Sequence, residues 1–216
     1  MSIDAGGLSS IERDALAEIA NIGVSRAATS LRRMVGQQVL LSVPAVDIVT
    51  REAASRRVEK GHRGKLVAVQ QSFEGPFSGR ALLIFPQAHS LELVRSIVGD
   101  DHALEDVIDL EQEALAETGN IILNACLATI ANVLGRTMRM SLPSVVLGTG
   151  PDLFGINAPA VDGNLVMFLY IDFAIKDRDI HGFIALLMDL PSMTALKDIV
   201  GDYIGGIGRH DAGNVA

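Results

Sequence analysis

The sequence predicts an α+β fold of two pseudo-symmetric half-domain repeats, which together form one antiparallel sheet with helices packed against it. The first observation is a duplication: residues 10–49 align without a gap with residues 109–148, at an offset of 99 residues. The second is that each copy is followed by two apolar runs joined by a short polar connection. A parallel crossover needs a dozen or more residues, so these pairs predict antiparallel hairpins. The third is the order of elements in each copy, which is a helix, a strand, a strand pair and a helix. This order is typical of α+β layers and not of repeated βαβ units.

The first element is a helix over residues 10–35. Most positions from 15 to 28 are apolar, and Ser9, Ser10 and Asp14 supply N-terminal capping chemistry. Gly36 is expected to end the helix. Pro44 then closes a short S-x-P turn that leads into a strand, and the 99-residue offset predicts the same helix, turn and strand in the second copy.

The later elements also echo each other between the copies. Each hairpin leads into a helix that ends in the letters IVGD, and we place one domain over 1–216, built of repeats at about 10–105 and 109–204. The Gly-rich segment 205–216 is expected to be a flexible tail. The predicted strands are 66–73 with 80–85, joined by EGPFSG, and 165–175 with 182–190, joined by KDRDIH.

Composition limits the classes of partner. The hydrophobic fraction of 49% is ample for a core, and the formal net charge is -8. An acidic surface does not favour a nucleic-acid backbone. The basic segment 51–65 is a solvated loop or short helix, or else a landing surface for an acidic partner; it holds no aromatic residue for stacking on bases.

Cysteine and histidine usage points to a cytoplasmic chain without a metal site of its own. Cys126 is the single cysteine, which fits a reducing compartment. The five histidines show no ligand spacing. No apolar signal run or uninterrupted membrane-spanning run is present, so neither secretion nor a membrane is expected. GTGPDLFG at 148–155 fits no phosphate-loop pattern and is expected to be a turn.

Each repeated helix carries one narrow polar seam. At about 100° per residue, the polar positions of each helix fall within an arc of roughly 60°. Both seams hold a glutamate followed three residues later by an asparagine, and neither holds a lysine. The two seams are Asp14, Glu18, Asn21 and Ser25 in the first copy, and Glu113, Glu117, Asn120 and Asn124 in the second.

Three explanations of the seams stay open from chemistry alone. They are plain solvent-facing edges, or their asparagines satisfy backbone groups, or they are functional. Asparagine is a poor residue inside a helix, so its presence twice needs a reason. A glutamate can pair with a partner's lysine, and an amide can hold a water beside an electrophile. Such positioning is how much of phosphoryl-transfer catalysis proceeds.

The spacing of these residues resembles the signature of the CheC/CheX/FliY family of chemotaxis phosphatases. An acidic residue or serine is followed by E-x-x-N, by 22 residues, and by proline. The first copy is Asp14-x3-Glu18-x2-Asn21-x22-Pro44, and the second is Glu113-x3-Glu117-x2-Asn120-x22-Pro143. The resemblance covers essentially the whole chain, and the duplicated layout and length look most like the CheC members. The second copy keeps a glycine before its asparagine, at Gly119, where the first has Ala20.

The resemblance implies hydrolysis of the aspartyl phosphate of a phosphorylated CheY-like response regulator, in chemotaxis or a related two-component pathway. It implies that Glu18 and Glu117 pair with the regulator's lysine, and that Asn21 and Asn120 orient the attacking water. The supporting residues would be Asp14, Glu113, Pro44 and Pro143. The regulator would supply the Mg²⁺, and no cofactor is expected on this chain. The alternative is a CheC-like binding module that docks on a response regulator or on the receptor deamidase CheD without turnover.

Overall fold

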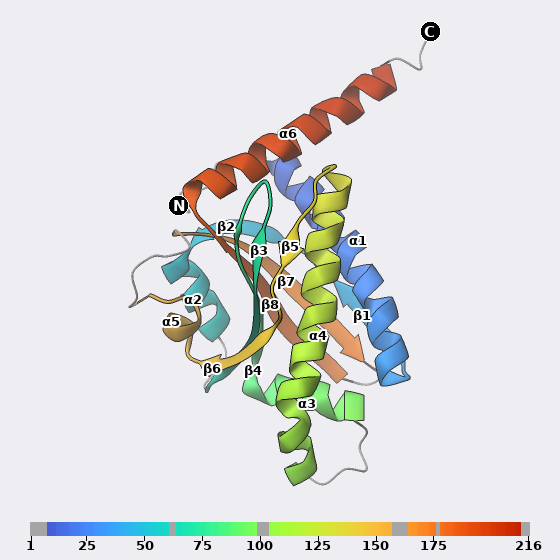
Figure 1. The fold of residues 1–216 in the computed structure, drawn as a ribbon, viewed down its shortest axis with the longest axis vertical. Helices are drawn as coiled ribbons and strands as arrows, with labels where there is room; N and C mark the ends of the chain where they lie inside the picture. Colours follow the sequence, from blue (N-terminus) through green and yellow to red (C-terminus); the bar gives the residue numbers. More distant parts are fainter. Residues whose placement is uncertain (1–7, 61–63, 99–103, 157–163, 176–177, 213–216) are drawn as a thin grey trace.

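The computed structural model describes residues 8–60, 64–98, 104–156, 164–175 and 178–212. Its strands form one eight-stranded sheet, in the order β1-β7-β8-β4-β3-β5, with β2 also on β7 and β6 also on β3 (Figure 1). Every pairing is antiparallel, which confirms the predicted fold class. The elements are α1 Ser10–Val35, β1 Val39–Ser42, β2 Val46–Thr50, α2 Arg51–Glu59, β3 Leu66–Glu74, β4 Gly79–Pro86, α3 Gln87–Val98, α4 Leu104–Val133, β5 Arg139–Met140, β6 Ser144–Gly148, α5 Gly150–Leu153, β7 Leu165–Ile175, β8 Arg178–Met188 and α6 Leu190–Ala212.

Local chemistry sets both ends of α1. Ser9 is the N-cap: its hydroxyl accepts from the backbone N–H of Glu12, and the Glu12 carboxylate accepts from the backbone N–H of Ser9. Gly36 closes the helix in the left-handed conformation, with φ of 70°. The boundaries are those that the sequence predicts, although the capping acid is Glu12 and not Asp14.

The two repeats are interlaced in the sheet rather than laid side by side. The short strands β1 and β2 of the first repeat pair with β7 of the second. In the same way β5 and β6 of the second repeat pair with β3 of the first. The two hairpins meet in the middle, where β4 pairs with β8. Each repeat therefore completes the sheet of the other.

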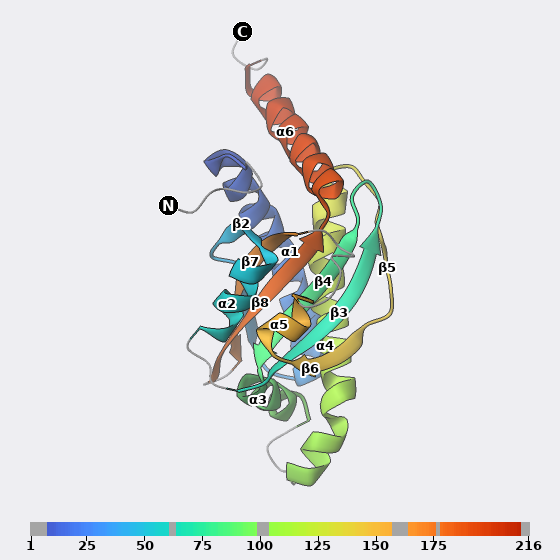
Figure 2. The same cartoon turned by 90° about the vertical axis from the view of Figure 1, so that its left-hand side faces the viewer.

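Helices cover both faces of the sheet, and alternation along the strands supplies two apolar layers. In β3 the side chains of Val67 and Val69 belong to the core beneath α1 and α4, whereas Leu66 and Ala68 belong to the core beneath α2 and α5. Figure 2 shows α2 and α5 on one side of the sheet and α1 and α4 on the other.

The long helices α1 and α4 lie against each other on their face of the sheet (Figure 1). A Cβ on Gly23 would lie 2.8 Å from the Cα of Cys126, so the two backbones approach closely at this point. The Leu110–Val133 part of α4 is long and apolar enough to cross a membrane by length and composition, but 61% of its most apolar 18-residue window is buried within the fold. Its apolarity is accounted for by packing in the core.

Several expected boundaries differ from the structure. Strand β8 begins at Arg178, not at residue 182, so residues 178–181 belong to the strand and not to the connection. The basic segment forms the short helix α2 over residues 51–59, which is one of the forms expected for it. A short helix, α5, occupies Gly150–Leu153 within the expected turn. Helix α6 continues to Ala212, through most of the segment that was expected to be a flexible tail. Tyr203 and Ile204, just before that segment, pack against the core. Residues 213–216 lie outside the described residues.

Candidate functional site

Both glutamate–asparagine pairs lie at the surface of the packed helices. Glu18 and Glu117 are exposed, and Asn21 and Asn120 are half-buried one turn further along α1 and α4. Asp14 and Glu113 are exposed one turn before the glutamates. The polar seams are therefore accessible to a partner, while the asparagines also reach into the protein.

Asn21 is bound to the backbone of the loop between β1 and β2. Its Nδ2 donates to the carbonyl oxygen of Val43 at 3.0 Å, and its Oδ1 accepts from the N–H of Val43 at 2.7 Å. Val43 is buried, and the next residue is the exposed Pro44. The two bonds hold the Asn21 amide in one orientation. They leave it one N–H and one oxygen lone pair, since an amide has two of each.

Asn120 is held differently, by side chains. Its Oδ1 accepts from Nε2 of Gln71, on β3, at 3.2 Å and from Nδ2 of Asn124 at 2.6 Å. The same Gln71 Nε2 donates to the carbonyl oxygen of Ser141, in the loop before the half-buried Pro143, at 2.9 Å. Gln71 thus stands between the asparagine and the proline loop of the second repeat.

The loops beside the two asparagines also differ. Position 22 residues after Asn21 is Val43, which is 1% exposed, whereas the matching Leu142 is 89% exposed. Ser141 is held by β3: its N–H donates to the Ser72 carbonyl, and its hydroxyl accepts from the Ser72 N–H. The Leu142 side chain therefore projects into solvent next to the second pair.

Gln71 was not singled out in the sequence, although the duplication carried a signal. Strand β2 places Val46 opposite Leu169, and β6 places the matching Val145 opposite Val69, so β3 and β7 correspond at an offset of 100 residues. Ile171 is then the counterpart of Gln71. One repeat holds an amide where the other holds a buried isoleucine.

The two pairs are far apart in the sheet order. The loop beside Asn21 follows β1, next to β7, and the loop beside Asn120 follows β5, next to β3. These are opposite ends of the sheet. The structure keeps the two pairs as separate sites, each with its own proline loop.

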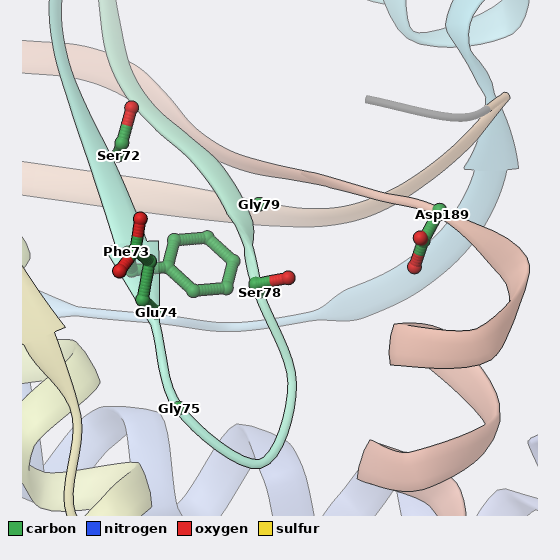
Figure 3. Close-up of a pocket in the computed structure, with 7 residues that line it drawn as sticks. All are labelled: Ser72, Phe73, Glu74, Gly75, Ser78, Gly79 and Asp189. Carbon is green, nitrogen blue, oxygen red and sulfur yellow. The ribbon is translucent and has the colours of Figure 1, made fainter. Parts of the chain in front are cut away.

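One polar cavity among the described residues lies apart from both pairs. It has a volume of about 440 Å³ and lies between the β3–β4 hairpin and the start of α6, as Figure 3 shows. It is lined by polar and small groups that include Glu74 and Asp189. Hydrogen bonds from the side chain and the backbone N–H of Ser192 hold the pKa of Asp189 below its ordinary value.

The basic segment lies away from both pairs. Helix α2 packs on the opposite face of the sheet, where Arg51 is buried. Arg57 pairs with Asp47 at 2.6 Å and lies over the ring of Phe168. Two arginines of the predicted landing surface, Arg51 and Arg57, therefore take part in packing within the protein.

The described part of the chain shows neither a metal-binding cluster nor a reactive thiol. No group of three or more His, Cys, Asp or Glu side chains there is placed to hold a metal ion. Burial raises the pKa of the Cys126 thiol to about 12, so the thiol stays protonated.

Comparison with known proteins matches both repeats. The CheC-like family model matches residues 11–48, and the model of the chemotaxis phosphatase CheX matches residues 67–155. Each match contains one complete glutamate–asparagine pair and its proline. The chain belongs to the CheC/CheX/FliY family.

Curated relatives of this family align over most of the chain. The flagellar motor switch phosphatase FliY of Bacillus subtilis is 25% identical over 195 residues, which cover 89% of this chain and 49% of FliY. The CheY-P phosphatase CheC of the same organism is 25% identical over 155 residues, 69% of this chain and 70% of CheC. This chain spans about half the length of the FliY relative.

Solved structures in the CheC/CheX/FliY family and beyond share the fold. The crystal structure of Thermotoga maritima FliY covers 91% of this chain and 99% of its own, with a TM-score of 0.72 and 19% identity. FliM in a FliG–FliM complex from H. pylori covers 88% of this chain and all of its own, with a TM-score of 0.61 and 10% identity.

Proposed function

We propose that this CheC/CheX/FliY-family chain is a phosphatase that hydrolyses the aspartyl phosphate of a phosphorylated CheY-like response regulator. The observation that carries the proposal is the pair itself: an exposed glutamate and a held asparagine, one helical turn apart, present in both repeats. The curated names of the relatives FliY and CheC, both phosphatases, support the same activity.

In this mechanism the chain supplies position and not a nucleophile. Glu18 and Glu117 pair with a lysine of the regulator and set the depth of docking. Asn21 and Asn120 then hold a water in line with the phosphorus. Phosphoryl transfer gains most of its rate from such alignment and from charge stabilisation, and an amide fixed before docking loses little freedom when the regulator binds.

The backbone bonds of Asn21 give that residue a structural role as well. Two hydrogen bonds to Val43 account for an asparagine at this position whether or not it touches a substrate. The proposal therefore needs a test that separates folding from turnover. The proline loop that Asn21 holds is in this view a support for the amide's orientation, which is the role we propose for Pro44 and Pro143.

The test is phosphate release from a response regulator of the same genome, charged with acetyl phosphate in Mg²⁺. The chains compared are wild type, Asn21→Ala, Asn120→Ala and the double variant, with circular dichroism and urea unfolding to show that each folds. We expect wild type to accelerate release and the double variant to lose that acceleration. Asn132→Ala, an exposed asparagine near the end of α4, is the matched control and should retain it.

The second candidate is a binding module that docks on the regulator, or on a CheD-like deamidase, without turnover. The fold shared with FliM favours keeping it, because it shows that this architecture is not confined to proteins named as phosphatases. It would be supported if wild type bound the phosphorylated regulator and left the decay rate unchanged. The deamidase partner rests on the family resemblance alone.

The proposal has two corollaries. The Mg²⁺ is the regulator's own ion, so chelation should act on the regulator and leave the fold of this chain unchanged. The protein is placed in the cytoplasm, where response regulators of this kind act and where the lone thiol of Cys126 would stay reduced.

A further inference from the structure

We propose that Gln71 is a positioning residue of the second site: it fixes which edge of the Asn120 amide faces the regulator. The inference rests on the proposed function of the Glu117–Asn120 pair and adds a residue from β3 that lies outside the family signature. It is carried by the direction of three hydrogen bonds, by the burial of Gln71 and by the contrast with the first repeat.

A backbone carbonyl fixes which groups in the network donate and which accept. The oxygen of Ser141 can only accept, so the Gln71 atom that faces it at 2.9 Å must be the NH₂ group. The same NH₂ group faces Asn120 at 3.2 Å, so the Asn120 atom there must be its oxygen. Side-chain amides are often ambiguous in orientation, but here a group of fixed polarity removes the ambiguity.

Asn120 is thereby turned with its NH₂ group outward. Both lone pairs of its oxygen are engaged, one by Gln71 and one by Asn124. Within the described part of the chain, its NH₂ group has no hydrogen-bond partner. A water beside Asn120 can accept one of these N–H groups through one lone pair and keep the other lone pair for the phosphorus.

Gln71 occupies its position at a cost to the fold. It is 1% exposed, and its Oε1 is buried without a hydrogen-bond partner. Such atoms are uncommon in native proteins and call for an explanation. The equivalent Ile171 shows that the architecture accepts a plain apolar side chain here. A positioning role at the second site explains why an amide stands at position 71.

The contrast with the first site makes the inference specific. Asn21 is oriented by the backbone of Val43, so the first site needs no side chain from the sheet. In the second repeat the matching Leu142 is displaced outward, and Gln71 bridges the gap between Asn120 and the loop. The asparagine amide is therefore oriented by backbone groups in the first repeat and by a side chain in the second.

The test measures only the second site, in a chain that carries Asn21→Ala. Into this chain we introduce Gln71→Met, because methionine has nearly the same length and volume as glutamine and no hydrogen-bond donor. We expect the maximal rate of regulator dephosphorylation to fall at least tenfold. The dissociation constant for the regulator bound to BeF₃⁻ and Mg²⁺ should stay within twofold, because Glu117 is untouched. The urea midpoint should not fall, because the orphaned oxygen is removed.

The matched control is Gln70→Met, the neighbouring glutamine whose side chain faces the other side of β3 and contacts Arg80. It should leave the rate unchanged. An unchanged rate in the Gln71→Met chain would overturn the proposal. So would an equal loss in the Gln70→Met chain, since the effect would then be a general one on the strand.

A second readout does not need turnover. In a ¹⁵N-labelled chain, the side-chain NH₂ signals of Asn120, assigned by their loss in Asn120→Ala, should be a single sharp pair in wild type. They should broaden or shift in Gln71→Met. If wild type fails to accelerate phosphate release, the proposed function fails, and this signal alone decides the positioning: an unchanged Asn120 pair in Gln71→Met overturns it.

Discussion

The side chain of Asn21 and the backbone of Val43 form a closed two-hydrogen-bond pair, at 3.0 and 2.7 Å, in which each acts as donor and as acceptor. The pair ties the middle of α1 to the loop between β1 and β2. Since Pro44 follows directly, the asparagine and the proline are held as neighbours although 22 residues separate them. The long spacing in the signature is the length of chain needed to finish α1 and return along β1.

Asn21→Ala should therefore lower stability more than Asn120→Ala does. The first change leaves the N–H and C=O of buried Val43 without their partners, at about 1–3 kcal/mol. The second leaves Gln71 its bond to Ser141. Urea unfolding curves compare the two variants. Asn21→Asp, which keeps the acceptor and loses the donor, should fall between wild type and Asn21→Ala. Equal midpoints for all four chains would contradict this account.

Gly119→Ala should destabilise the protein and disturb the second site. An added Cβ would lie closer than 3.0 Å to three side-chain atoms of Val69 on β3, so the helix or the strand must shift. Helix propensity alone would predict the opposite sign, a gain of about 1 kcal/mol. Unfolding free energies decide between these signs. Val69→Ala should partly rescue Gly119→Ala, and independent, additive losses would rule out the contact as the cause.

Glu12→Ala should weaken the start of α1 in a pH-dependent way. The hydrogen bond from the Ser9 backbone N–H lowers the pKa of Glu12 from its ordinary value of 4.5. Because the folded pKa is depressed, the stabilisation is full above 4.5 and is lost as the pH falls through the folded value. We expect Glu12→Ala to cost about 0.3–1 kcal/mol at pH 7.

The same comparison at low pH supplies the control for Glu12. The difference in unfolding free energy between wild type and Glu12→Ala should shrink steadily below pH 4.5. Glu12→Gln, which can still accept the Ser9 bond but carries no charge, should show a smaller loss at pH 7 and less dependence on pH. A difference that stayed constant from pH 7 to pH 3 would speak against the capping carboxylate.

Cys126 should resist thiol reagents in the folded protein. Its thiol is buried, its pKa is raised to about 12, and its backbone lies against Gly23 of α1. Reaction with a disulfide reagent at pH 8 should thus require opening of the α1–α4 contact. Gly23→Ala, which pushes the two backbones apart, should speed labelling, whereas the exposed change Ser30→Ala on the same helix should not. Rapid labelling of wild type would contradict the packing.

Some boundaries of the fold could be predicted from the sequence because they depend on residues close to them in the chain. The ends of α1 follow from Ser9 and Gly36, which act on their own turn of helix. The start of β8 was missed because Arg178 and Asp179 look like turn residues, whereas their place in the strand is set by pairing with β7.

In the candidate site, too, the local features could be predicted from the sequence and the long-range contacts could not. The duplicated Glu–Asn spacing could be read directly, and backbone bonding by a seam asparagine stood among the explanations left open. Which of the two asparagines bonds to backbone could not be read, because it depends on whether Val43 or Leu142 turns inward. Gln71 is 49 residues from Asn120, and only the folded sheet brings them together.

Because the strands of the two repeats are interlaced, one repeat alone cannot form a sheet whose strands all have their partners. Cut away from residues 104–212, the first repeat would lose β7, with which β1 and β2 pair, and β8, with which β4 pairs, so its strands would present open edges. Two copies of a single repeat could close those edges by lending each other a hairpin. The smallest self-sufficient form of this architecture is thus a reciprocal exchange between two equal parts, which the present chain carries out within a single molecule.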